Sequence, residues 1–201
     1  MADRLDAYRQ RRDAARTSEP GLAPAESDLA RRRGGEPRFV IQKHDASSLH
    51  YDLRLEVDGT LRSWAVPKGP STDPRERRLA VEVEDHPLSY GDFEGVIGDG
   101  AYGAGTVIVW DAGTYRNLDE DRSVAEALEA GHAKVWLEGE KLRGGWTLHR
   151  TRAGRKPQWL LIKRRDEGAD ARRNPQSTQP RSVRTGMTIE EMAREHGQGR
   201  A

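Results

Sequence analysis

Polar and apolar side chains alternate strictly over several short segments in the middle of the chain. In the segment 50–57 the polar positions are occupied by His50, Asp52, Arg54 and Glu56. Because successive side chains of a β-strand point to opposite faces, these four residues are expected to share one face. Asp58-Gly59 follows, a strong signal for a two-residue hairpin turn. The predicted register places Arg54 opposite Ser63, Asp52 opposite Ala65 and Leu53 opposite Trp64.

Similar runs recur from Phe39 to about Arg165 and predict nine strands. Their ranges are 39–44, 50–57, 60–66, 78–86, 105–110, 113–117, 134–138, 145–151 and 158–164. One helix is predicted over 123–130, because Ser123 and Glu126 form a capping box and Gly131 suits its end. Many short strands with one short helix predict a mainly β fold, a closed antiparallel β-barrel. The five tryptophans all fall in predicted strands and are interpreted as core residues.

The segment 78–86 repeats the alternation and contains a third histidine, His86. Leu79, Val81 and Val83 are expected on its core face. The other face should carry Arg78, Glu82, Glu84 and His86. Convergence of this face with the polar face of 50–57 is the simplest explanation for three histidines within 43 residues.

The two ends of the chain differ from its middle. The sequence divides into an N-terminal arm and linker (1–36), a barrel domain (37–165) and a polar, disordered C-terminal tail (166–201). A short helix is expected within 3–16 and a linker over 17–35, so both extensions are predicted to be flexible. The segment 188–196 carries Ile189 and Met192 on one side and is expected to bind a partner.

Composition and charge narrow the class of protein. The 201 residues include no cysteine, which excludes thiolate metal sites and disulfides. No signal peptide or membrane span is recognisable, so a cytoplasmic protein is expected. The net charge is +1, but residues 36–149 carry −8 and residues 150–201 carry +7. This basic end is a candidate binding surface for nucleic acid. The excess of arginine over lysine also fits a bias that comes from genome composition.

The clustered polar residues form a candidate metal and phosphate site. Histidine and aspartate are common ligands of transition metals, and His44 stands one short loop before His50 and Asp52. Arginine is a natural partner for phosphate, which gives Arg54 a role beside such a metal. Three alternatives remain open: a solvated strand face, a non-haem Fe(II) oxygenase triad built from His50, Asp52 and His86, and a non-catalytic module that binds DNA ends. His132 and His149 lie outside the cluster and receive no role.

The stretch 39–110 resembles the 3′-phosphoesterase domain family of bacterial DNA ligase D, including its stand-alone form. The segments that carry the resemblance are QKHDA (42–46), LHYD (49–52), SWAVPKGP (63–70), VEDHPL (83–88), FEG (93–95), YGAG (102–105) and VWD (109–111). A weaker resemblance extends upstream through Tyr8 and Arg12. Departures from the family pattern are small: Leu53 stands where phenylalanine is frequent, and Gly98 where proline is frequent.

The resemblance implies a Mn²⁺-dependent enzyme that trims DNA 3′ ends for double-strand break repair by end joining. Such an enzyme removes a 3′-ribonucleotide and then the 3′-phosphate, leaving a 3′-hydroxyl at a primer-template junction. The residues matching the metal ligands are His44, His50 and Asp52; those matching positions around the scissile phosphate are Arg54, His86 and Tyr90; and those matching positions needed for the phosphomonoesterase step are Lys68 and Arg78. No Lys-x-Asp-Gly motif of an adenylating ligase is present, so a separate DNA ligase and other end-joining proteins are expected as partners.

Overall fold

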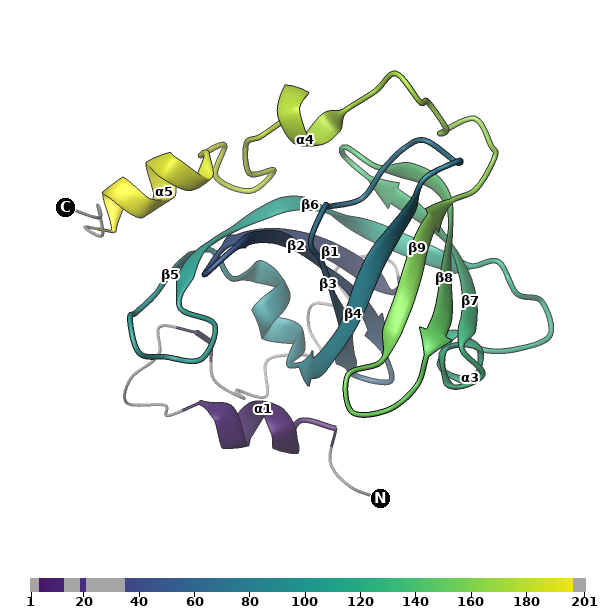
Figure 1. Cartoon of the computed structure of the whole chain (residues 1–201), viewed down its shortest axis with the longest axis horizontal. Helices are drawn as coiled ribbons and strands as arrows, with labels where there is room; N and C mark the ends of the chain where they lie inside the picture. Colours follow the sequence, from purple (N-terminus) through teal and green to yellow (C-terminus); the bar gives the residue numbers. More distant parts are fainter. Residues whose placement is uncertain (1–3, 13–18, 21–34, 197–201) are drawn as a thin grey trace.

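A computed structural model describes residues 4–12, 19–20 and 35–196 (Figure 1). Eight strands close into an antiparallel barrel in the order β1-β2-β3-β4-β9-β8-β7-β6, with β1 pairing again with β6. Their bounds are β1 (Arg38–Asp45), β2 (Leu49–Val57), β3 (Thr60–Val66), β4 (Arg77–His86), β6 (Gly105–Asn117), β7 (His132–Gly139), β8 (Arg143–Arg152) and β9 (Gln158–Lys163). A ninth strand, β5 (Gly95–Ile97), extends the sheet beyond β6. The prediction of a mainly β, closed antiparallel barrel is confirmed.

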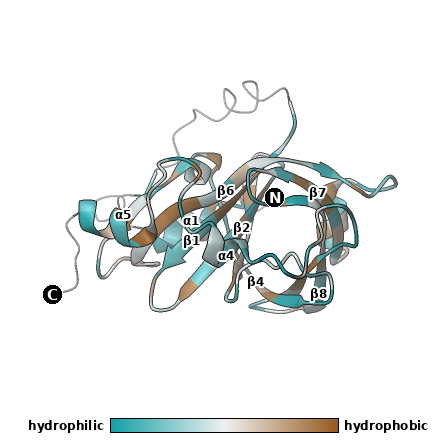
Figure 2. Cartoon of the chain, turned by 90° about the horizontal axis from the view of Figure 1, so that it is seen from above, coloured by the Kyte–Doolittle hydropathy of each residue, from teal (hydrophilic) through white to brown (hydrophobic). Residues whose placement is uncertain are grey.

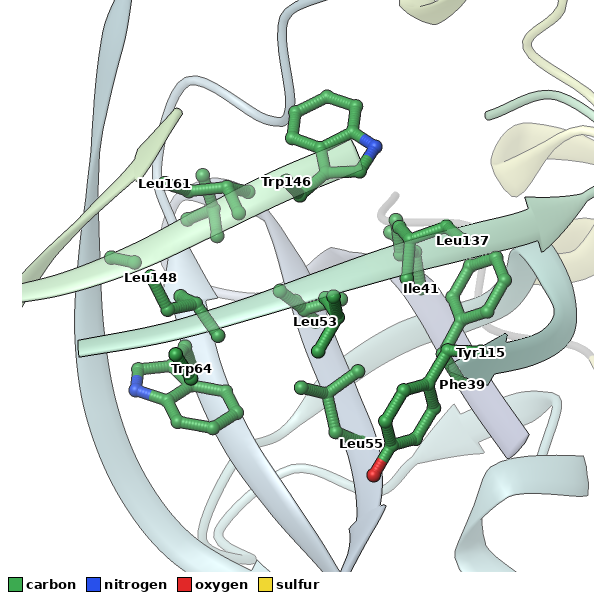
Figure 3. Packing of buried hydrophobic residues seen from close by; sticks show 14 of the residues in the cluster. Phe39, Ile41, Leu53, Leu55, Trp64, Tyr115, Leu137, Trp146, Leu148 and Leu161 are labelled. Atoms are coloured by element: carbon green, nitrogen blue, oxygen red, sulfur yellow. The ribbon is translucent and has the colours of Figure 1, made fainter. Parts of the chain in front are cut away.

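The barrel interior is filled by apolar side chains from all eight strands. Leu53, Leu55 and Trp64 from one side of the barrel point toward Leu148 and Leu161 from the other (Figure 3). Four of the five tryptophans are fully buried, as predicted for core residues: Trp64, Trp110, Trp146 and Trp159. Viewed from above, apolar stretches are distributed around the ring of strands (Figure 2). No helix in the described parts of the chain is both long and apolar enough to cross a membrane.

The predicted hairpin and its register are confirmed. Arg54 pairs with Ser63, Asp52 with Ala65 and Leu53 with Trp64. Asp58 and Gly59 both adopt positive φ, as this type of two-residue turn requires. The polar face of β2 therefore lies on the outside of the barrel wall while its apolar face enters the core.

The face prediction for 78–86 is wrong. Ala80 lies in the barrel core and Leu79 is 43% exposed, so the core face is the opposite of the one predicted. Val83 pairs with Ser63, but His86 pairs with Leu61, which means that β4 has one extra residue between these pairs. Such a bulge reverses the alternation beyond it. His86 consequently reaches the outer face, together with Arg54, whereas Arg78 keeps the inward parity of Ala80.

Other strand differences have local causes. The segments 105–110 and 113–117 form one continuous strand, β6, because Gly113 fits directly against the backbone of Glu138, where a Cβ atom would clash. β5 has only three residues and was not predicted. Between β4 and β5 the 3₁₀-helix η1 (Leu88–Asp92) folds across the outside of the barrel and carries Tyr90.

Four short α-helices lie outside the barrel strands in the described part of the chain. α3 (Val124–Glu129) has the predicted capping box between Ser123 and Glu126. α1 (Asp6–Arg11) is shorter than the predicted helix over 3–16 and contacts β4; residues 13–16 and most of the linker predicted over 17–35 lie outside the described residues. α4 (Pro175–Thr178) and α5 (Ile189–Glu195) follow the last strand.

The prediction of a disordered tail is wrong for residues 166–196, which are folded against the barrel (Figure 1). Ile189 and Met192 pack on Ile108 of β6, so the apolar side of α5 is covered by its own barrel and not by a partner. Backbone oxygens of Gln179 and Arg181 accept hydrogen bonds from Lys141. The low hydropathy of the tail led to the prediction of disorder, because hydropathy does not register hydrogen bonds such as those from Lys141.

Candidate metal centre

Three residues from two adjacent strands place their ligand atoms together on the outer face of the barrel. His44 comes from β1, His50 and Asp52 come from β2, and their candidate ligand atoms all lie within 4.8 Å of one another. His44 Nδ1 is 3.7 Å from Asp52 Oδ2, and His50 Nε2 is 3.6 Å from Asp52 Oδ1. The pairing of His44 with His50 across the two strands produces this arrangement directly. The described part of the chain holds no other cluster of three such groups.

Backbone carbonyls orient both imidazole rings. His44 Nε2 lies 2.9 Å from the carbonyl oxygen of Gly103, and His50 Nδ1 lies 2.9 Å from that of Ser48. Because a carbonyl oxygen can only accept, each of these nitrogens must carry the proton. The other nitrogen of each ring faces Asp52, which is the orientation that a metal bound between them would need.

Arg54 links this ligand set to the next group of residues. Its guanidinium donates to Asp52 Oδ2 (3.1 Å), Gln42 Oε1 (2.7 Å) and Ser63 Oγ (2.8 Å). Burial alone would raise the pKa of the Asp52 carboxyl, but Arg54, with His44 and His50, holds it well below its usual range. Asp52 is therefore ionised and available as a ligand at neutral pH.

His86 and Tyr90 lie on the other side of Arg54. Arg54 Nη1 is 3.0 Å from His86 Nδ1, and the Tyr90 ring packs edge-on against His86 with centroids 4.6 Å apart. Burial, together with the guanidinium groups of Arg54 and Arg12, holds the pKa of His86 well below its usual range. Burial also raises the pKa of Tyr90 well above its usual range. Both side chains are consequently neutral at pH 7.

The N-terminal arm supplies residues that the sequence did not reveal as part of the site. Arg12 Nη2 approaches His86 Nε2 at 3.3 Å, while Arg12 also pairs with Glu84 (3.1 Å) and Glu19 (2.9 Å). Its guanidinium lies 3.8 Å over the ring centroid of Tyr8, which is buried. The only sequence signal for this arm was the weak match around Tyr8 and Arg12.

These residues surround one open cavity of about 240 Å³. Its lining includes His44, His50, Asp52, Arg54, His86 and Tyr90. Lys68 and Arg78 do not line it: Lys68 is exposed in the turn after β3, and Arg78 pairs with Glu76 (2.5 Å) beside a separate cavity. Six of the eight predicted site residues are therefore brought together, and the roles of all eight stay predictions.

The donor set fits a divalent transition metal. Two imidazoles and one carboxylate form a mixed nitrogen and oxygen site that suits Mn²⁺, Fe²⁺ or Zn²⁺. A backbone carbonyl oxygen lies at hydrogen-bond distance from the second nitrogen of each imidazole, a common feature of histidine metal sites. His86 is not needed as a ligand, because His44 supplies the second imidazole.

Comparison with known proteins gives a consistent result. A family model for the DNA Ligase D 3′-phosphoesterase domain matches residues 42–150. The multifunctional non-homologous end joining protein LigD of Pseudomonas aeruginosa is 54% identical over 163 residues, which cover 81% of this chain and 19% of that protein. The LigD protein of Mycolicibacterium smegmatis is 43% identical over 172 residues, covering 83% of this chain and 21% of that protein. That of Mycobacterium tuberculosis is 44% identical over 160 residues, covering 80% and 20%. The chain thus spans about a fifth of the length of these relatives, and it belongs to the DNA ligase D 3′-phosphoesterase domain family.

Proposed function

We propose that this protein is a Mn²⁺-dependent phosphoesterase that removes 3′-ribonucleotides and 3′-phosphates from DNA ends. The observation that carries the proposal is the placement of the candidate ligands His44, His50 and Asp52 beside Arg54 and His86 in one cavity. The names of the relatives support a place in non-homologous end joining. The product would be a 3′-hydroxyl end that a DNA ligase can seal.

The metal ligands and Arg54 are proposed to have different roles around the scissile phosphate. A metal bound by His44, His50 and Asp52 would polarise a phosphoryl oxygen and lower the pKa of a bound water. Arg54 has five N–H groups, and three of its hydrogen bonds go to Gln42, Ser63 and Asp52. Its Nη1 also lies 3.0 Å from His86 Nδ1, a nitrogen that is 2.9 Å from the carbonyl oxygen of Glu84 as well. The second N–H of Nη2 is proposed to donate to a phosphoryl oxygen, and the main effect of Arg54 is to hold Asp52 and His86 in place.

His86 would contact the phosphate or transfer a proton. Neutral imidazole has one donor and one acceptor nitrogen, and it is kept neutral here by burial and by two guanidinium groups. Tyr90 fixes the orientation of the His86 ring through their edge-on contact and keeps its phenolic proton. Cationic groups aimed at the developing charge are the main source of acceleration in phosphoryl transfer.

Lys68 and Arg78 are proposed to act in the second step. A 3′-phosphate carries an additional negative charge near pH 7 that a diester lacks, so additional cations should matter more for its removal. Lys68→Ala or Arg78→Ala is expected to accumulate 3′-phosphate ends on a ribonucleotide-ended primer, measured on a sequencing gel. An equal loss of both steps would contradict this division and would indicate general positioning of the strand.

DNA and a sealing enzyme are the proposed partners. The exposed cations Arg152, Arg155 and Lys156 form the tip of the β8–β9 hairpin, and none of them makes an ion pair with the described residues. This tip adjoins β4, because Gln158 pairs with Val81 and the amide of Glu82 donates to the Pro157 carbonyl oxygen. It would contact the phosphates of a primer-template duplex entering the site.

The decisive experiment follows a labelled primer-template that ends in one 3′-ribonucleotide, incubated with Mn²⁺. Loss of the ribonucleoside followed by loss of the phosphate is expected. His50→Ala should abolish both steps, whereas His149→Ala, which removes an exposed histidine outside the cavity, should not. Tight binding with an unchanged 3′ end would instead indicate a non-catalytic module. Turnover of 2-oxoglutarate with Fe²⁺ would indicate an oxygenase.

A further inference from the structure

Tyr102 is an aromatic side chain that the proposed chemistry does not use. The chain has twelve phenylalanine, tyrosine and tryptophan residues, all within its described parts, and Tyr102 alone among them is exposed, at 51%. It also lines the cavity that holds the ligand set. A single exposed aromatic residue is ordinary on a protein surface, but this one stands at the mouth of the candidate site.

The ring is held in position from the N-terminal arm. Arg11 Nη1 donates to the Tyr102 hydroxyl at 2.9 Å, and the Arg11 guanidinium carbon lies 4.9 Å from the ring centroid. The same Arg11 nitrogen is 2.6 Å from Glu84 Oε2, which anchors the guanidinium on β4. The exposed ring is thus preorganised, so a ligand that packs on it loses little side-chain entropy.

The position of the ring is also tied to the metal ligands. Gly103, the next residue, adopts φ +80° and directs its carbonyl oxygen to His44 Nε2 at 2.9 Å. One peptide unit therefore connects the Tyr102 backbone to the group that orients a ligand. A planar group resting on Tyr102 would lie beside a phosphate bound at His44 and Asp52.

We propose that Tyr102 is the stacking platform for the base of the terminal 3′-nucleoside, an inference that rests on the proposed function. Aromatic rings stack on nucleobases without sequence preference, because every base has a π-face, and a guanidinium behind the ring adds a cation–π contribution. Arg11 of the N-terminal arm contacts both the hydroxyl and the ring of Tyr102, so we infer that the DNA strand ends at this ring. The stacked nucleoside is consequently the last one, which leaves when the diester is cleaved.

The test varies both the ring and the base. Primer-templates end in a ribonucleotide that either carries its base or has the base replaced by hydrogen, and kcat/KM is measured for both. The wild-type protein is expected to prefer the base-bearing end by roughly 5- to 150-fold, from the usual strength of base–aromatic stacking. Tyr102→Ala should remove this preference. Tyr102→Phe, which removes only the hydroxyl bond to Arg11, should retain most of it.

A matched control and a second readout separate the two hypotheses. Leu79→Ala removes another exposed apolar side chain, outside the cavity, and should keep the full preference. Binding is measured without metal on an end that carries the fluorescent base 2-aminopurine, whose emission stacking quenches. Quenching by the wild type that disappears in Tyr102→Ala supports the platform even if no turnover occurs, a result that would overturn only the proposed function. Absence of quenching, or a base preference that survives in Tyr102→Ala, would overturn the platform.

Discussion

The segment from Asp170 to His196 forms a C-terminal strap that is expected to detach when two of its side chains are shortened. Ile189 and Met192 are 4% and 3% exposed and both pack on Ile108. Truncating a buried Ile or Met to alanine costs about 2–5 kcal/mol. Because the two share one neighbour and the site is superficial, we take about 2 kcal/mol for each, or about 4 kcal/mol for the pair. At about 1.4 kcal/mol for each factor of ten, the open form of the strap should become about 10³-fold more populated.

Amide hydrogen exchange measures this opening locally. The amide of Val183 donates to the Val109 carbonyl oxygen at 2.9 Å, so its exchange reports strap release. In Ile189→Ala/Met192→Ala it should exchange far faster, while amides of β8 and β9 remain protected. Glu195→Ala, an exposed change on the same helix, is the control. Less than a tenfold acceleration at Val183 would refute the assignment of docking energy to these two residues.

Release of the strap should also impair catalysis. Ser182 Oγ donates to Glu94, and Arg184 pairs with Asp92 at 3.2 Å, so the strap holds both ends of the segment that follows Tyr90. Loosening this segment would disturb the packing of Tyr90 on His86. We expect kcat of the double variant on 3′-phosphate ends to fall by a larger factor than KM rises. Wild-type kcat in a variant with fast Val183 exchange would show that the barrel alone positions Tyr90.

The remaining predictions concern Asp52, His86 and the β8–β9 hairpin tip. Asp52→Ala should abolish Mn²⁺ binding in calorimetry and also destabilise the fold by about 1–3 kcal/mol, because it removes the carboxylate that pairs with the buried Arg54 guanidinium; unchanged unfolding by urea would contradict the second effect. The folded-state pKa of His86 lies below the unfolded value of 6.5, so stability should fall as pH drops below about 6.5, where only the unfolded chain takes up this proton. That decrease should be smaller in His86→Asn, measured as Tm between pH 7 and 5; an equal decrease would contradict the neutral assignment. Charge reversal at Arg152, Arg155 and Lys156 should flatten the salt dependence of duplex binding by up to about 0.9 in slope for each phosphate that the tip no longer neutralises; an unchanged slope would place the DNA elsewhere.

The part of the site that the sequence predicted lies on one hairpin and its neighbouring strand. Strict alternation and the Asp58-Gly59 turn determine the register of β2 and β3, and with it the shared face of Asp52 and Arg54. His44 follows because β1 pairs with β2 and places it opposite His50. These contacts depend on local rules, namely the period of two and the geometry of a two-residue turn, and short-range rules can be read from a sequence.

What escaped prediction depends on longer-range packing. The bulge in β4 leaves no mark in the sequence, since the alternation of 78–86 looks regular, yet it decides which side of the strand faces the core. The N-terminal arm is polar, and it is attached through Arg11 and Arg12 to Glu84. The C-terminal strap docks partly through the backbone carbonyls of Gln179 and Arg181 and partly through Ile189 and Met192. The apolar side of 188–196 was visible in the sequence, but the surface that it packs on was not. Ion pairs and single hydrogen bonds have no period, so hydrophobic periodicity does not detect them.

The segments outside the barrel explain how the polar face of β2 becomes enclosed. An exposed strand would leave Asp52 and Arg54 in water, where an ion pair has little strength. Here η1, the loop containing Tyr102 and the N-terminal arm cover that face, so Arg54 is 2% and Asp52 6% exposed. Buried charges must be paired, and the barrel provides the pairs on rigid strands. The N-terminal arm and η1 belong to the chain outside the eight strands and do not hold the rings of His44 and His50, so changes there should alter substrate access and pKa values more than the ligand geometry. The loop containing Tyr102 differs, because the carbonyl oxygen of Gly103 orients His44.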